Sequence, residues 1–331
     1  MCDNEIPSVT QLNADTESLI IQAASGRSQF FKDGHFPLQF VHLSDIHNQK
    51  ELWNRMAEYV NGHPSISFAL HTGDYCGNSQ MNYEDFYTKC TPCSVPILNC
   101  TGNHDFCPSA KERDNASPES VHKLLFNHTE NWDVAFMDGE YSMAYCKDIP
   151  DSNIRLIVLN CYSDIEQQAE WLAGQLAEAK ALGYHVITAA HESTARISCP
   201  ADVTFRTADD YESLGMKKRT PMPFDRIIAE FKKNGGTHVC HLCGHEHTDR
   251  FGHTDSGILN IVIECATDWA GWCDGARIRG DRSYDCFNVV TVNTDVHVLK
   301  LIRVGRDRDH YLRKKKALCY DYLENKIIYN E

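Results

Sequence analysis

Short apolar runs followed by clusters of polar residues recur along this chain. Runs at 38–44, 67–72 and 95–100 have the length of buried strands, and helical periodicity over 51–60 and 81–89 fills the gaps between them. Strands that alternate with helices in this way are typical of a βαβ architecture. Because such sheets place their sites at strand ends, the polar clusters after these runs are candidate site residues.

The same pattern predicts a second sheet further along the chain. Apolar runs at 140–145 and 154–159 predict paired strands that begin it, and an amphipathic helix is predicted over 167–181. Strands at 257–265 and 287–292 are expected to complete this second sheet. The other predicted elements are a strand at 185–190, a helix at 224–233, a run at 237–240, a strand at 296–304 and a C-terminal pair of surface strands.

The N-terminal residues are interpreted as an extension of one domain. They are polar apart from an amphipathic stretch at 17–24, which predicts a helix lying against the core. We therefore expect an N-terminal extension packed on the core, residues 1–36, followed by a single domain, residues 37–331.

Composition narrows the classes of function. The chain of 331 residues is 42% hydrophobic and 24% charged, which is typical of a globular protein. Its formal net charge of −14 disfavours nucleic acid as a partner. No apolar run approaches the roughly 18 residues of a membrane-spanning helix, and the polar start of the sequence lacks the pattern of a signal peptide. We therefore expect a cytoplasmic protein with no membrane partner.

The cysteines allow two interpretations. The chain has 15 of them, and an odd number without an export signal is expected to consist of reduced thiols. Two Cys-x-x-Cys pairs occur, Cys90/Cys93 and Cys240/Cys243. Together these pairs could form a structural zinc site, or each thiol could be a small buried apolar residue.

Residues suited to metal binding follow five of the predicted strands. In Gly244-His245-Glu246-His247 the two histidines are two positions apart, so at a strand end both are expected to lean toward one point. Gly244 lets the backbone turn close beside that point. Imidazole and carboxylate groups are common metal ligands. The candidate residues, in chain order, are Asp45, His47, Asp74, Asn103, His104, His191, His245 and His247.

The order of these clusters resembles the calcineurin-like metallophosphoesterase superfamily, whose motifs are D-x-H, G-D, G-N-H-D/E, H and G-H-x-H. The resemblance spans residues 45–247. It implies an α/β fold, namely a four-layer α/β/β/α sandwich with two mixed β-sheets. It also implies two divalent metal ions as cofactors, bound in loops at one edge. Mn, Fe, Zn, Ni and Co all suit such mixed nitrogen and oxygen ligands.

The resemblance also implies a role for each position. A hydroxide that bridges the two metals would attack phosphorus in line, and a general acid would contribute about 10²–10⁴-fold. By position, Asp45, His47 and His247 would bind the first metal, Asp74 would bridge both, Asn103, His191 and His245 would bind the second, and His104, next to Asn103 at the substrate, would protonate the leaving group.

Departures from known branches of the superfamily favour a small substrate. Gly73-Asp74 is not followed by the D-R-G of protein Ser/Thr phosphatases, and Gly77 stands where purple acid phosphatases have a tyrosine. The extra histidine of the double-strand-break nucleases is also missing after Asp74. We therefore predict a phosphodiesterase or small-substrate phosphatase that acts on small phosphate esters. The alternatives are a nuclease and a catalytically silent scaffold, as in a retromer-type subunit.

One segment, 266–284, combines aromatic and basic residues in an otherwise acidic protein. Its Trp269, Trp272 and Arg277 could bind substrate, because Arg forks suit phosphate oxygens and indole faces can stack on rings. We hypothesise that this loop borders the dimetal site and determines substrate choice. The alternative is a solvated hairpin with buried tryptophans.

Overall fold

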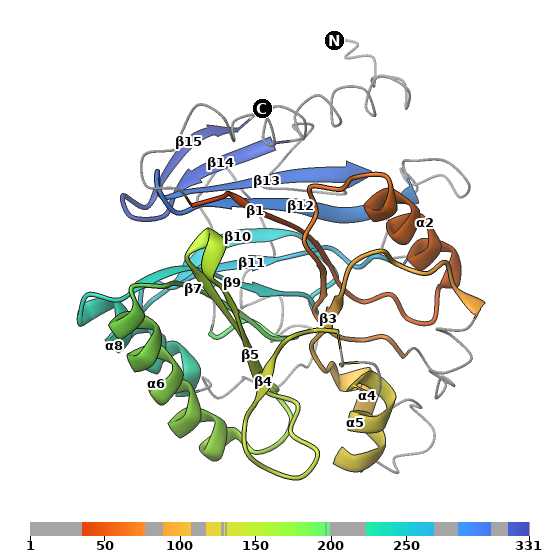
Figure 1. Ribbon diagram of the computed structural model, residues 1–331, viewed down its shortest axis with the longest axis horizontal. Helices are drawn as coiled ribbons and strands as arrows, with labels where there is room; N and C mark the ends of the chain where they lie inside the picture. Colours follow the sequence, from red (N-terminus) through yellow and green to blue (C-terminus); the bar gives the residue numbers. More distant parts are fainter. Residues whose placement is uncertain are drawn as a thin grey trace, which may run out of the picture.

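The computed structural model shows two β-sheets with helices around them (Figure 1). The helix predicted at 17–24, nearly all of the helix predicted at 81–89, and the tryptophan and arginine residues of the 266–284 segment lie outside the described residues. The division into residues 1–36 and 37–331 therefore stays a prediction. The structure describes residues 35–76, 89–106, 117–126, 129, 131–195, 197–198, 223–267, 284–305 and 317–330.

The first sheet has seven strands in the order β15-β14-β13-β12-β1-β2-β3. Strands β1, β2 and β3 are parallel, as the βαβ pattern predicts, and the other pairs are antiparallel. The C-terminal pair β14–β15 forms its edge, as predicted. The bounds are β1 (Leu38–Leu43), β2 (Ala69–His71), β3 (Ile97–Asn99), β12 (Cys286–Asn293), β13 (Val298–Gly305), β14 (Ala317–Asp321) and β15 (Lys326–Asn330).

The second sheet has eight strands in the order β4-β5-β6-β7-β9-β11-β10-β8. Its central strands β6, β7, β9 and β11 run parallel to one another. Both sheets are therefore mixed. The bounds are β4 (Ala135–Phe136), β5 (Tyr145–Ile149), β6 (Ile154–Val158), β7 (His185–Ala189), β8 (Ile197–Ser198), β9 (Thr237–Cys243), β10 (Arg250–Thr254) and β11 (Leu259–Val262).

Two strand predictions were wrong. The run at 287–292 was expected in the second sheet, but β12 pairs antiparallel with β1 in the first sheet. The run at 140–145 was expected to be a strand, but β5 begins only at Tyr145. Tyr141 has a φ of 62°, in the left-handed region that an extended strand cannot contain, so the chain turns before β5 starts.

Helices cover the outer sides of the two sheets, which gives the predicted α/β layers. Helices α6 and α8 lie on the face of the second sheet turned away from the first (Figure 1), and their apolar side chains form a separate core cluster there. Helix α2 packs on the first sheet through Tyr59, whose ring is 5.1 Å from that of Phe287. The bounds are α2 (Lys50–Asn61), α4 (Asn103–Phe106), α5 (Pro118–Phe126), the 3₁₀ helix η2 (Pro150–Ser152), α6 (Ile165–Leu182) and α8 (Pro223–Lys233).

The main core lies between the sheets. It joins buried residues of the first sheet, such as Val41 and Val290, to residues of the second, such as Leu156 and Val239. Strand β1 is buried at all six positions, because it has a neighbour on each side and layers above and below. Among the described helices, none is both long and apolar enough to cross a membrane.

Candidate metal centre

The candidate ligands lie in the segments that directly follow parallel strands of both sheets. In the first sheet, Asp45 and His47 follow β1, and Asp74 follows β2. Asn103 and His104 follow β3 and begin helix α4. In the second sheet, His191 follows β7, and His245 and His247 follow β9. The predicted association of polar clusters with strand ends is therefore confirmed.

One group of potential ligands consists of Asp45, His47, Asp74 and His247, whose donor atoms all lie within 4.8 Å of one another. His247 Nε2 is 3.1 Å from Asp45 Oδ1 and 3.2 Å from His47 Nε2. His47 Nε2 is 4.0 Å from Asp74 Oδ2. Two carboxylates and two imidazoles thus surround one point.

A second group consists of Asp74, His191 and His245. His191 Nε2 lies 3.3 Å from Asp74 Oδ2 and 3.1 Å from His245 Nδ1. Asn103 joins this group, because its Oδ1 is 2.8 Å from the same nitrogen of His245. Asp74 belongs to both groups, so its carboxylate lies between them.

The two histidines of the Gly-His-x-His stretch reach different groups, so the expectation that both lean toward one point was wrong. Strand β9 ends at Cys243, and His245 and His247 follow it with φ values of 67° and 52°. Strand alternation does not apply to left-handed backbone. Asp45, His47 and Asp74 also have positive φ. Such conformations cost energy in non-glycine residues and cluster at functional sites.

Hydrogen bonds to main-chain carbonyls orient two of the imidazoles. His47 Nδ1 lies 2.9 Å from the carbonyl oxygen of Cys76, and His191 Nδ1 lies 2.6 Å from that of Thr72. A carbonyl only accepts, so each Nδ1 donates its proton, and in the neutral ring the lone pair is on Nε2. In both residues Nε2 faces the ligand groups, which is the arrangement found in metal-binding histidines.

Opposite charges outweigh the cost of burial at Asp45 and His191, whereas at His47 burial prevails and lowers the pKa. Burial alone would raise the pKa of Asp45, but His247 and His191 hold it well below its usual range. Burial alone would lower the pKa of His191, but the carboxylates of Asp74 and Asp45 raise it to about 10. Without a metal, a proton on His191 therefore balances part of the carboxylate charge, and a cation that binds there must displace it.

The donor set fits divalent cations. Asp45 Oδ1 is buried and accepts no hydrogen bond within the described part of the chain. A buried anionic oxygen without a hydrogen bond is costly unless a cation neutralises it. Mixed carboxylate, amide and imidazole ligands suit first-row transition metals. The residues of the two groups therefore fit metal ions.

His104 is half-buried at the border of the first group. Its ring lies edge-on to that of His47, with 4.9 Å between centroids, and its main-chain N–H donates to Asp74 Oδ1 over 2.8 Å. The carboxylate between the two groups thus also fixes the backbone of His104. Its role as general acid stays a prediction.

Asp105 was not assigned a role from the sequence, but it organises the centre. Its buried carboxylate accepts hydrogen bonds from the main-chain N–H groups of Asp74, Cys76 and Gly102, over 3.1, 3.0 and 2.7 Å. Burial and the nearby Asp74 raise its pKa to about 7. The sequence did contain a signal for this residue, namely an acidic residue directly after Gly-Asn-His. The side chain of Asp105 connects the loops that follow β2 and β3.

Cys265 is a second residue that the sequence interpretation missed. It follows β11 and forms a third group of potential ligands with His47 and His247. The sequence signal was its place at the end of the predicted strand 257–265; that this strand ends at the same edge as β9 follows only from their parallel pairing in the structure. In contrast, none of the metal-binding groups found among the described residues includes Cys90, Cys93, Cys240 or Cys243. Cys90, Cys240 and Cys243 are buried core residues, and the partly buried Cys93 packs against the core.

Gly244 allows two ligand loops to approach closely, which leads to a stability prediction. A Cβ at this position would collide with Ser44 Oγ and lie 2.5 Å from Asp45 Oδ2. We expect Gly244→Ala to lower the free energy of unfolding by about 1–3 kcal/mol and to weaken metal binding, because Asp45 must move. Thermal unfolding and metal titration measure the two effects.

Gly174 provides the matched control for that variant. It lies within helix α6, and a Cβ there would have no atom within 4 Å. Gly174→Ala should therefore raise the free energy of unfolding by roughly 0.5–1 kcal/mol and leave metal binding unchanged. If Gly244→Ala behaves like this control, the close approach at Gly244 is unimportant.

Two mixed sheets therefore meet at a cluster of carboxylates and imidazoles that suits divalent metal ions. The sequence model of the calcineurin-like phosphoesterases matches residues 38–249, which is more than half of the chain. The chain belongs to this family. No curated protein matches the sequence.

One solved structure shows the same fold at low sequence identity, and another is similar more distantly. A dimetal phosphatase from Danio rerio is similar with a TM-score of 0.54 and 12% identity, over 86% of this chain and 99% of that one. A 5'-nucleotidase from Candida albicans is similar with a TM-score of 0.39 and 12% identity, over 87% of this chain and 52% of that one. At these identities the likeness concerns the fold, and the first structure carries it.

Proposed function

We propose that this protein hydrolyses small phosphate esters, either diesters or small monoesters, with two divalent metal ions. Asp45, His47 and His247 would hold the first ion, and Asn103, His191 and His245 the second. Asp74 would bridge them. The observation that carries this proposal is the position of Asp74, which is shared by two groups of donors that have no other member in common.

A bridging carboxylate favours the binding of two close cations. Its charge reduces their mutual repulsion, and its oxygens are separate donors. In Asp74, Oδ2 lies 3.3 Å from His191 Nε2 and 4.0 Å from His47 Nε2, so one carboxylate reaches the imidazoles of both groups. Two metal ions in such a site polarise the phosphoryl group and lower the pKa of a coordinated water.

The protein's own residues would place and protonate the substrate. His104 would hold a proton at a ring nitrogen and deliver it to the leaving oxygen; its half-buried position beside His47 supports this role. Asn103 would contact the phosphate. Trp269, Trp272 and Arg277 are proposed to contact the rest of the substrate. The net charge of −14 favours small substrates over nucleic acid.

Metal content and hydrolysis together test this proposal. Protein purified without chelator should contain close to two transition-metal ions per chain by elemental analysis. It should hydrolyse a chromogenic phosphodiester or monoester, lose that activity with chelator and regain it with Mn²⁺, Fe²⁺ or Zn²⁺.

A content of one ion or none, with no activity after any of these additions, would contradict the two-metal function. Two bound ions without hydrolysis of either substrate would instead favour a catalytically silent scaffold. Activity restricted to long nucleic acids would favour the nuclease alternative.

A further inference from the structure

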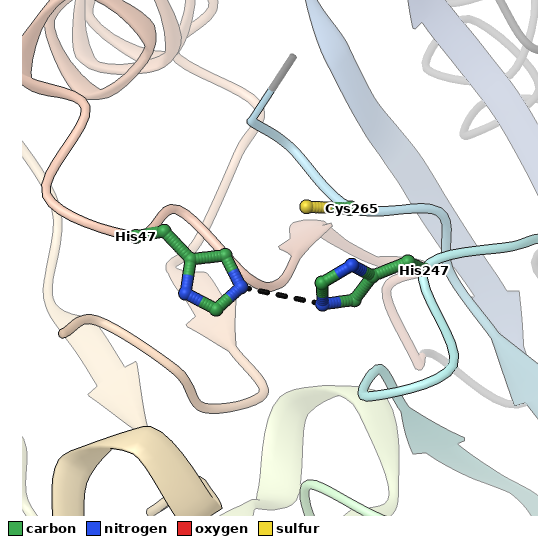
Figure 2. Close-up of side chains that lie close together, drawn as sticks. All are labelled: His47, His247 and Cys265. Atoms are coloured by element: carbon green, nitrogen blue, oxygen red, sulfur yellow. Dashed lines mark hydrogen bonds between the residues drawn. The ribbon is translucent and has the colours of Figure 1, made fainter. Parts of the chain in front are cut away.

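Cys265 is buried beside the first ligand group, where its thiol donates a hydrogen bond to the main-chain carbonyl oxygen of Asp45 over 3.2 Å. It is 2% exposed, and its Sγ forms a cluster with one ring nitrogen each of His47 and His247, in which the three ligand atoms lie within 4.8 Å of one another. Figure 2 shows the sulfur beside the two imidazole rings, which come from the segments after β1 and β9. Three segments distant in sequence thus bring one sulfur and two nitrogens together.

Two further observations indicate that a cation belongs at this point. His47 Nδ1 is occupied by the carbonyl oxygen of Cys76, so its Nε2 presents a lone pair to the cluster. Asp45 Oδ1, fully buried and without a hydrogen bond in the described part of the chain, lies 3.1 Å from His247 Nε2 and 3.8 Å from His47 Nε2. An anionic oxygen and two imidazole nitrogens therefore converge next to the thiol.

We propose that Cys265 is a sulfur ligand of the first metal ion, beside His47 and His247. This inference rests on the proposed metal centre and adds a ligand to it. A zinc ion binds sulfur at about 2.3 Å and nitrogen at about 2.0–2.1 Å, so a sulfur and a nitrogen ligand of one ion are about 3.6 Å apart at a tetrahedral angle and about 4.4 Å apart on opposite sides. The spacing of the cluster agrees with this after a small inward movement. On binding, the thiol would give up its hydrogen bond to the Asp45 carbonyl oxygen and lose that proton to solvent, and the thiolate would bind the metal.

A sulfur ligand would make the two metal positions chemically different. Thiolate favours softer ions such as Zn²⁺, Fe²⁺ and Co²⁺ over Mg²⁺ and Mn²⁺. The second position, with Asp74, Asn103, His191 and His245, offers oxygen and nitrogen only. Cys265 would therefore direct a thiophilic ion to the first position, while the second accepts harder ions.

Cobalt provides a direct spectroscopic test on the full-length protein. Metal-free protein loaded with Co²⁺ should show a near-ultraviolet thiolate-to-cobalt charge-transfer band. Cys265→Ala should abolish this band while cobalt still binds, and should reduce the preference for Zn²⁺ over Mn²⁺ by at least the roughly tenfold loss that even outer-shell partners cause.

Cys240→Ala is the matched control, because Cys240 is equally buried but lies within β9 and belongs to a Cys-x-x-Cys pair. It should keep the band; a band lost in Cys240→Ala instead would overturn the assignment to Cys265. Cobalt binding to the wild type without a charge-transfer band would overturn the sulfur ligand but leave the dimetal centre in place. Failure to bind cobalt at all would overturn both.

X-ray absorption spectroscopy of the zinc-loaded wild type measures the atoms bound to zinc directly. This test does not depend on the folding of any variant. A sulfur neighbour at about 2.3 Å from zinc is expected. A shell of nitrogen and oxygen alone would overturn the proposal even if Cys265→Ala failed to fold.

Discussion

Asp74→Asn is expected to release both metal ions and reduce hydrolysis to background. Asparagine retains an oxygen that can accept the 2.8 Å hydrogen bond from the His104 main chain, and it tolerates the φ of 59° at this position. The substitution therefore removes the charge with little change in shape. Because Asp74 belongs to both ligand groups, metal affinity should fall by more than the roughly 10–100-fold seen for outer-shell partners. Elemental analysis and steady-state kinetics measure the two losses.

The control is Asp138→Asn, which changes an exposed carboxylate outside the ligand groups. It should keep wild-type metal content and activity. If Asp74→Asn retained two ions, or lost activity with its full metal content, Asp74 would not be the bridging ligand.

His104→Ala should produce the opposite separation, with metals retained and kcat lowered by about 10²–10⁴-fold. The main-chain N–H that binds Asp74 remains, so the ligand groups keep their geometry. The loss should be large for esters with poor leaving groups and small for nitrophenyl esters, which depart with little protonation. Measuring kcat for both kinds of ester, with metal content in parallel, provides the comparison.

His253→Ala serves as its control, since His253 is a half-buried histidine in β10 outside the ligand groups. It should leave the ratio of the two rates unchanged. An equal loss in His104→Ala on good and poor leaving groups would exclude the general-acid role.

The order of strands and ligands could be predicted because both depend on local sequence. Strand β1 is a mostly apolar run, and Asp45 follows it within two residues, so strand and polar cluster are visible together. Strand pairing is not visible in this way. Gln39 of β1 bonds Thr291 of β12 over 3.0 Å and 252 residues of sequence, and no periodicity encodes that partner. This is why β12 was placed in the wrong sheet.

The details of the centre depend on backbone conformations and on tertiary contacts. The residue types at positions 245 and 247 do not indicate that His245 and His247 adopt positive φ. A strand geometry was therefore assumed for them. Asp105 and Cys265 were missed for a related reason. Asp105 accepts hydrogen bonds from main-chain N–H groups, which any residue type can provide. Cys265 has the size and burial of an ordinary small core residue.

Each ligand group combines donors from both sheets, and this has a consequence beyond catalysis. The first group joins Asp45 and His47 to His247, and the second joins Asp74 to His191 and His245. A cation in either position would therefore link the loops of the first sheet to those of the second. In the first group, for example, it would connect His47 to His247, which are 200 residues apart in sequence. Ions that bind only the folded chain add to its stability in proportion to the logarithm of their free concentration. Loss of the metal ions would therefore stop turnover and also weaken the contact between the two sheets. The less stable chain would be cleaved by proteases more readily, so the amount of protein would follow the metal supply.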